Sequence, residues 1–239
     1  MSSKQNLQVT PSNHTSTGTI SYRDGNPLIQ FIIGEQERML VGQSVRLVGK
    51  FSCFKNASKD VPATSDSLRM SEQLGIFSII DSLTIKSQAT HQVIEEIRHF
   101  PRFMASYLPT TSSLEDYSGH LGQQVLVTPN HNAQTTGVVS KGDGSFCIPL
   151  PCGLFNGQNP IPLMANGAGG VGGILVEIQL APDSNVFFDA NGSASSDDVK
   201  DAFYELSTVS ISAEVMTPDP SVQVPAASTF EYNSISSYF

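Results

Sequence analysis

A repeated alternation of apolar and polar residues is the feature that restricts the fold of this chain most strongly. In residues 174–180, ILVEIQL, every even position is apolar, while Glu177 and Gln179 stand at odd positions. Residues 44–54 and 208–215 repeat the pattern. Because successive side chains of a strand point to opposite faces, each run predicts a strand with one buried face.

Two further apolar runs, at 28–33 and 77–87, predict additional strands. Turn-forming clusters separate the runs, namely RDGNP at 23–27, KGDG at 141–144 and GAGGVGG at 167–173. The 19 Gly and 14 Pro residues among 239 favour many turns and few helices. The chain therefore has eight or so strands and is long enough to bury a core of its own.

Residues 90–100, THQVIEEIRHF, break this pattern. The spacing of Val93, Ile94 and Ile97 is helical, Thr90 is a suitable N-cap, and Pro101 ends or kinks the segment. One short helix inserted between strands indicates a β-sandwich with an extended loop.

Residues 146–152, FCIPLPC, predict a strand at the edge of its sheet. Pro149 and Pro151 lack N–H groups along the same side, so that side cannot be fully paired. The apolar faces of all these runs predict the core: Val45, Leu47, Phe51, Ile79, Leu83, Ile85, Phe146, Ile148, Leu150, Ile174, Val176, Ile178, Leu180, Val209, Ile211 and Val215.

The charge distribution argues against nucleic acid as a partner. Residues 121–239 hold two basic side chains, Lys141 and Lys200, against eleven acidic ones. Such a surface repels phosphate backbones and anionic lipid. We therefore predict no direct nucleic-acid binding. No apolar run is long enough to span a bilayer, so we also predict no membrane insertion.

The three cysteines, Cys53, Cys147 and Cys152, form no metal-binding pattern and are predicted to be reduced, mostly buried thiols. The Gly167-x-Gly169-x-x-Gly172 sequence resembles a dinucleotide fingerprint, but a strand follows it where that motif requires a helix. We therefore predict no cofactor.

The acidic loop 189–198 resembles a calcium loop but has Ala194 and Lys200 where the EF-hand pattern has Gly and Glu. We interpret it as a solvated loop and predict no metal, although a weak cation site at a subunit contact stays open. His99 is predicted to pair with Glu95 and Glu96 on the surface. These patterns favour no catalytic site, so we predict that the protein is not an enzyme.

Segments 77–103, 145–167, 174–182 and 204–216 together resemble the jelly-roll capsid proteins of the double-jelly-roll lineage of DNA viruses. That lineage includes adenovirus-like, Polinton-like and nucleocytoplasmic large DNA viruses. The resemblance covers about residues 20–216 and is to the first jelly roll. It implies an all-β fold, an antiparallel eight-stranded jelly-roll sandwich with one short inserted helix.

The domain boundaries follow from this resemblance and from composition. Residues 1–18, of which eleven are Ser, Thr, Asn or Gln, are predicted to be a flexible polar arm. Residues 19–218 form the jelly-roll domain, and 219–239 form a C-terminal tail. The aromatic residues of the tail are the predicted assembly contacts: Phe230, Tyr232, Tyr238 and Phe239.

The resemblance implies a structural capsid protein that assembles with itself, as a homotrimer or larger capsomer, and with neighbouring capsid proteins. Its place would be the virion capsid, after synthesis in the host cytoplasm or nucleus. A jelly-roll carbohydrate-binding module is the alternative, and the 189–198 loop is its candidate cation site. A cupin-like enzyme ranks third, because it requires a His/Glu metal cluster that the sequence lacks.

Overall fold

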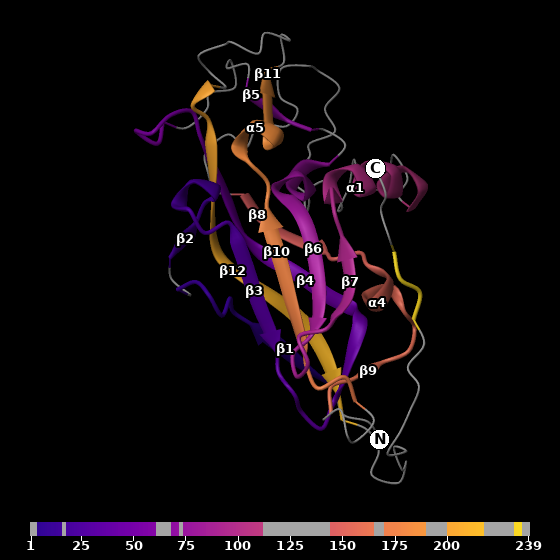
Figure 1. Ribbon diagram of the computed structural model, residues 1–239. Coiled ribbons are helices and arrows are strands. Elements are labelled where there is room, and N and C mark those ends of the chain that lie inside the picture. Colours follow the sequence, from indigo (N-terminus) through magenta and orange to yellow (C-terminus); the bar gives the residue numbers. More distant parts are fainter. Residues whose placement is uncertain are drawn as a thin grey trace.

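The computed structural model describes residues 4–15, 18–60, 68–71, 74–111, 144–164, 170–189, 200–217 and 232–235. Two antiparallel sheets face each other and enclose one core (Figure 1). The alternating sequence runs form the strands of both sheets, with their apolar faces turned inward.

The first sheet has the strand order β1-β12-β4-β8, with two short strands at its margins. Its members are β1 (Lys4–Val9), β12 (Phe203–Met216), β4 (Met39–Phe54) and β8 (Gly144–Pro149), with β2 (Thr19–Ile20) paired to β12 and β9 (Ile161–Pro162) paired to β4. The long β12 and β4 lie side by side through the centre, and two register shifts interrupt their pairing.

The second sheet has the order β3-β10-β6-β7. Its members are β3 (Leu28–Ile33), β10 (Ile174–Leu180), β6 (Ile80–Ser87) and β7 (Val93–Ile97). A register shift between Ile85 and Lys86 marks a bulge in the β6–β7 pairing.

The connectivity identifies the fold. The eight strands of these two orders are, along the chain, β1, β3, β4, β6, β7, β8, β10 and β12. When they are numbered 1 to 8 in that order, the first sheet has the strand order 1-8-3-6 and the second has 2-7-4-5. Each strand is thus followed by one in the opposite sheet, apart from one hairpin, β6–β7. This is the jelly-roll arrangement, so the predicted fold class is confirmed.

The remaining elements lie in the connections. They are η1 (Tyr22–Asp24), β5 (Leu68–Met70), η2 (Gly75–Ile79), α1 (Phe100–Thr111), α4 (Gly153–Asn156), α5 (Asp183–Val186) and β11 (Phe187–Asp189). Strands β5 and β11 pair beyond one end of the sandwich, close to α5 (Figure 1).

All sixteen predicted core residues are buried, none exposing more than 5% of its surface. The strand predicted at 77–87 begins only at Ile80, because residues 77–79 belong to η2. The core also contains Ile76 and Phe77 of η2 and Phe100 and Met104 of α1. These residues close the core near the end of the sandwich at which α1 lies.

The helix predicted at 90–100 is wrong. Val93–Ile97 forms β7, and the inserted helix begins at Phe100 instead of ending there. Pro101 lies in the first turn of α1, where a missing N–H removes no helical hydrogen bond. The carbonyl of His99 accepts the first bonds, from Arg102 N and Phe103 N. Pro101 therefore opens a helix.

The expectation that all of residues 1–18 form a flexible arm is corrected by β1. Lys4–Val9 pairs antiparallel with β12, from Lys4 opposite Met216 to Val9 opposite Ile211. Its side chains are largely exposed, but Leu7 and Val9 pack against the core. An edge strand is held chiefly by backbone hydrogen bonds, which polar composition does not prevent.

The predicted edge position of the FCIPLPC strand is confirmed, because β8 ends the strand order of its sheet within the described part of the chain. Cys53 and Cys152 are buried and Cys147 is half-buried, and none of the three forms a disulfide. This agrees with the interpretation drawn from their number and spacing.

Candidate functional site at the C-terminal segment

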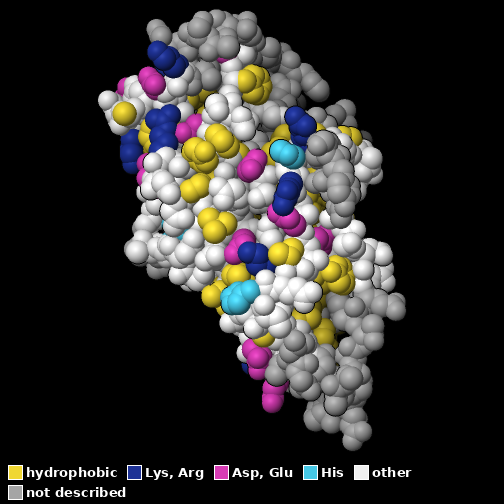
Figure 2. Space-filling view, in the orientation of Figure 1, with side chains coloured by type: hydrophobic (Ala, Val, Ile, Leu, Met, Phe, Trp, Pro, Cys, Tyr) yellow, Lys and Arg dark blue, Asp and Glu magenta, His cyan; other side chains and the backbone are white. Residues whose placement is uncertain are grey.

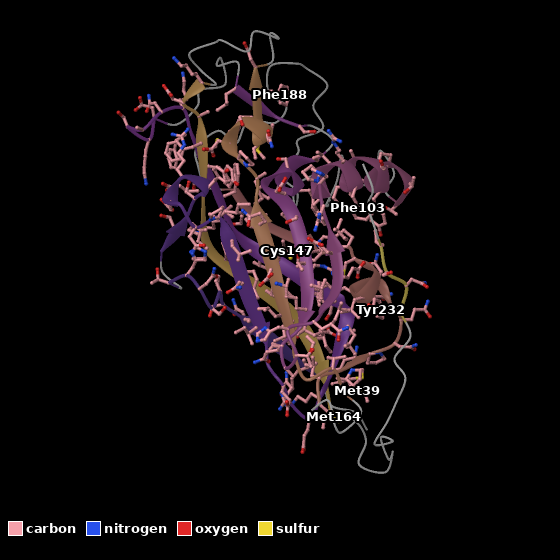
Figure 3. All side chains as sticks on the ribbon, viewed as in Figure 1. Met39, Phe103, Cys147, Met164, Phe188 and Tyr232 are labelled. Atoms are coloured by element: carbon pink, nitrogen blue, oxygen red, sulfur yellow. The ribbon has the colours of Figure 1, made fainter. Side chains whose placement is uncertain are left out.

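Residues 232–235 return to the subunit and lie across the side of the sandwich between β7 and α4 (Figure 3). We call the surface that receives them the tail groove, and define it by Ile94 and Glu95 of β7 and Gly153 and Leu154 of α4. A cavity of about 740 Å³ adjoins the docked segment on the α4 side. The groove joins the two sheets, because β7 belongs to one and α4 follows β8 of the other.

Glu95 is the centre of the tail groove. It is only 4% exposed, and both of its carboxylate oxygens accept backbone hydrogen bonds. Oε1 accepts from Gly153 N at 2.8 Å and from Ile235 N at 2.8 Å, while Oε2 accepts from Leu154 N at 2.9 Å. A buried carboxylate with three N–H donors is well satisfied, and it ties β7, α4 and the C-terminal segment together.

The strand geometry explains why Glu95 points inward. Glu95 pairs with Ile85 and Glu96 with Thr84, so their side chains face opposite sides of the sheet. Glu96 lies at the surface and binds Arg98, with 3.0 Å between Oε1 and Nε. The predicted surface grouping of His99 with Glu95 and Glu96 is therefore wrong, since Glu95 is buried and the partner of Glu96 is Arg98.

Gly153 allows the chain to approach closely. A Cβ at this position would overlap the carbonyl oxygen of Asn233 and come within 2.9 Å of Ser234 Cα. Real Cβ atoms essentially never come this close to backbone atoms. The docked segment and a side chain at position 153 therefore exclude each other.

Tyr232 and Ile235 supply the side-chain contacts of the segment. Both are half-buried against the core, and the Tyr232 hydroxyl donates to the carbonyl of Ile94 at 2.9 Å. Ile94 is the residue at the β6–β7 bulge, where the ladder leaves it without a registered partner. Burial raises the pKa of Tyr232, and the nearby Glu95 and Cys152 add to the shift.

Cys152 caps α4 beneath the tail groove. Its sulfur accepts a hydrogen bond from Phe155 N at 3.3 Å. Burial raises the pKa of the Cys152 thiol far above its ordinary value, and the negative charge of Glu95 raises it further. Because the thiolate is the reactive form, this cysteine is suited to packing and capping and poorly suited to nucleophilic chemistry.

The opposite side of the sandwich is closed by residues that follow β1. Ser12 N donates to Gln30 O at 2.7 Å. The Asn13 side chain bonds the edge of β3 twice, donating to Leu28 O at 2.6 Å and accepting from Gln30 N at 2.9 Å. The chain thus pairs with the first sheet through β1 and covers the edge of the second sheet a few residues later.

No family model matches the sequence, and a search of curated proteins gives no match. Solved structures do match. The Faustovirus major capsid protein is 8% identical with a TM-score of 0.55, over 92% of this chain and 55% of that one. A cryo-EM structure of the Sputnik virophage gives 10% identity and a TM-score of 0.52, over 93% of this chain and 49% of that one. PBCV-1 VP54, fitted into a cryo-EM reconstruction of Sputnik, is 12% identical with a TM-score of 0.50, over 92% of this chain and 43% of that one.

The chain has a jelly-roll fold like that of these viral capsid proteins. The resemblance found in the sequence is thereby confirmed at the level of fold. The chain spans about half the length of the capsid chains it matches.

Within this capsid fold, only part of the predicted assembly site can be placed. Tyr232 lies in the tail groove of its own subunit, beside α4 (Figure 3). Phe230, Tyr238 and Phe239 lie outside the described residues. Sequence reasoning missed Glu95 and Gly153, although the period-two placement of Glu95 and Ile97 could have indicated that both face the core.

Of the other motifs, Gly172 and Gly173 have left-handed φ values of 69° and 79° and lead directly into β10. The described part of the glycine-rich stretch, residues 170–173, is therefore a loop before a strand, as predicted. Gly167 and Gly169 lie outside the described residues. Of the 189–198 loop, only Asp189 is described. Among the described residues, no group of three His, Cys, Asp or Glu side chains could hold a metal ion.

A second cavity, of about 1000 Å³, lies near α5 and β11. Its one arginine, Arg23, donates to Asp183 Oδ2 at 2.8 Å and to Ala202 O at 2.9 Å, and stacks over the Phe203 ring at 4.6 Å. The guanidinium is thus bonded within the fold, and we assign it a structural role. The described helices include none long and apolar enough to cross a membrane.

Several basic side chains elsewhere on the described surface form ion pairs with acidic ones. Lys86 Nζ lies 2.6 Å from Glu177 Oε2, and Lys59 Nζ lies 2.8 Å from Glu205 Oε1. Figure 2 shows the same mixing of charges on the face it presents, where Lys and Arg are interspersed with Asp and Glu.

Proposed function

We propose that this protein is a structural capsid protein, which self-assembles into capsomers of the virion and acts by assembly without catalysis. The observation that supports this most strongly is the structural likeness of this jelly roll to viral capsid proteins over more than nine-tenths of the chain. A fold alone does not determine function, so the proposal needs a direct test of assembly.

The tail is proposed to contribute to the contacts between copies. Tyr232 and Ile235 offer apolar surface that their own subunit buries only in part. Phe230, Tyr238 and Phe239 would add aromatic side chains, the type most often found at interface hot spots. Deleting residues 228–239 should weaken assembly and leave the subunit folded, because β12 ends at Met216.

Cohesion without nucleic acid is the second part of the proposal. The net charge of −9 and the pairing of surface cations with carboxylates favour protein contacts over phosphate contacts. The purified protein should therefore show no tight, salt-sensitive binding to a DNA duplex in a fluorescence anisotropy titration. Partners would be further copies and neighbouring capsid proteins.

Size-exclusion chromatography with light scattering, followed by negative-stain electron microscopy, tests the proposal. A trimer or larger closed assembly is expected. A stable monomer that binds immobilised sugars would instead support the carbohydrate-binding alternative. Tight DNA binding would contradict the proposal that the copies are held together by protein contacts without nucleic acid.

A further inference from the structure

We infer that the tail groove is an exchange site, which in the assembled protein receives residues 232–235 of a neighbouring copy. This inference rests on the proposed capsid function and specifies one contact that would join the copies. The occupant is the same segment that lies in the groove within one subunit, so no new surface has to form.

The groove recognises this segment by shape and by backbone hydrogen bonding. Gly153 leaves space for a backbone and for nothing larger, since a Cβ there would overlap Asn233. Glu95 Oε1 accepts from Ile235 N, and the Ile94 carbonyl accepts from the Tyr232 hydroxyl. Each of these contacts is the same whether the segment comes from its own subunit or from a neighbour.

The docked segment is not part of either sheet. Among the described residues, its contacts include hydrogen bonds from the Tyr232 hydroxyl and the Ile235 amide and two half-buried side chains, while β1 at the other terminus forms a continuous ladder. Release of residues 232–235 from the groove therefore breaks no strand pairing and leaves the eight-stranded sandwich intact. Such a segment can exchange without unfolding the subunit.

The chain is long enough for exchange. Fifteen residues separate Met216, the end of β12, from Tyr232. A stretch of this length can span up to about 50 Å, which exceeds the width of a small domain. In a capsomer, the segments of adjacent copies would have an effective concentration comparable to that of a subunit's own segment. Exchange would keep every groove filled and would also link the copies.

Complementation between two full-length variants tests this inference. The groove-blocked variant is Gly153→Ala, which keeps an intact segment. The segment-disabled variant is Tyr232→Ala with Ile235→Ala, which keeps an intact groove. Gly157→Ala is the matched control, because a Cβ at the end of the same helix would meet only Leu154 O at an ordinary 3.5 Å. Circular dichroism should show all three folded.

If segments are exchanged, each disabled variant alone should assemble at least about tenfold less well than wild type, and Gly157→Ala should assemble normally. An equimolar mixture should form hetero-oligomers in preference to either homo-oligomer, because the intact segment of one variant fits the intact groove of the other. Native mass spectrometry with a mass tag on one variant measures this. Normal assembly of Gly153→Ala, or a mixture that forms no hetero-oligomers, would overturn the inference and would indicate docking within one subunit.

A peptide of residues 228–239 provides a test on the wild-type protein, independent of how the variants fold. An excess of the peptide should dissociate the wild-type assembly, while the same peptide with Tyr232 and Ile235 replaced by Ala should not. An assembly unaffected by either peptide would contradict exchange but not the capsid proposal. A wild-type protein that stays monomeric would contradict the capsid proposal itself.

Discussion

The two terminal segments close opposite sides of the same sandwich, but they are attached by different interactions. Lys4–Val9 forms a strand of the first sheet, and Ser12 and Asn13 then cover the edge of β3. Residues 232–235 cover the edge of β7 without joining a sheet, and depend on Glu95, Gly153 and the Tyr232 hydroxyl. A backbone ladder tolerates most side chains, whereas docking through a few groups is sensitive to single substitutions.

Paired deletions test this difference most directly. Removing residues 1–9 takes a strand from the sheet and exposes the edge of β12. The free energy of unfolding should therefore fall by about 6 kcal/mol, from six register pairs at roughly 1 kcal/mol each. Removing residues 228–239 should lower it by less than about 2 kcal/mol, because it takes away two hydrogen bonds and two half-buried side chains but no strand. Urea denaturation monitored by circular dichroism measures both. Equal losses would show that the termini are equivalent in stability.

Glu95 and its neighbour Glu96 form a matched pair of substitutions. Glu95→Ala leaves the backbone amides of Gly153, Leu154 and Ile235 without their acceptor. It should therefore lower the free energy of unfolding by about 3 kcal/mol or more. Glu96→Ala removes only a surface pair with Arg98 and should cost less than about 0.5 kcal/mol. Thermal and urea unfolding compare the two. A small effect of Glu95→Ala would mean that water readily replaces the carboxylate.

A single substitution at Asn13 tests how the residues after β1 hold the edge of β3. Asn13→Ala removes both side-chain hydrogen bonds to this edge and should lower the free energy of unfolding by about 1–2 kcal/mol. Ser12→Ala, which removes one exposed bond to Gln30 O, should cost less than about 0.5 kcal/mol and provides the control. If both substitutions are neutral, the side-chain bonds of Ser12 and Asn13 to β3 contribute nothing measurable to the stability of the fold.

Tyr232 should give the smallest effect and a distinctive dependence on pH. Tyr232→Phe should weaken docking by about 1 kcal/mol, measured as faster hydrogen exchange at the Ile235 amide. The docked state raises the pKa of Tyr232 above its ordinary value of 10.0, so the protonated form favours docking. The contribution of the Tyr232 hydroxyl to the stability of the docked segment should therefore be complete below about pH 10. It should disappear as the pH rises through the raised pKa of Tyr232. Tyr232→Phe should remove this pH dependence.

The period-two alternation was sufficient to predict the strands β4, β10 and β12 and the core residues on them. Ile178 and Ile211, taken from alternating runs, are both fully buried, and Pro149 correctly indicated an edge strand. These predictions succeed because burial of one strand face depends on residues close together in the chain.

The tertiary structure alone decided which segments close the sandwich. Residues 4–9 read as a polar arm, because an edge strand is stabilised by hydrogen bonds from a partner that lies about two hundred residues away. Residues 93–97 read as helix, because a bulged strand and a helix place Ile94 and Ile97 equally well on an apolar face. Glu95 and Gly153 gained their roles only through long-range contacts with each other and with residues 232–235, which no local pattern can encode.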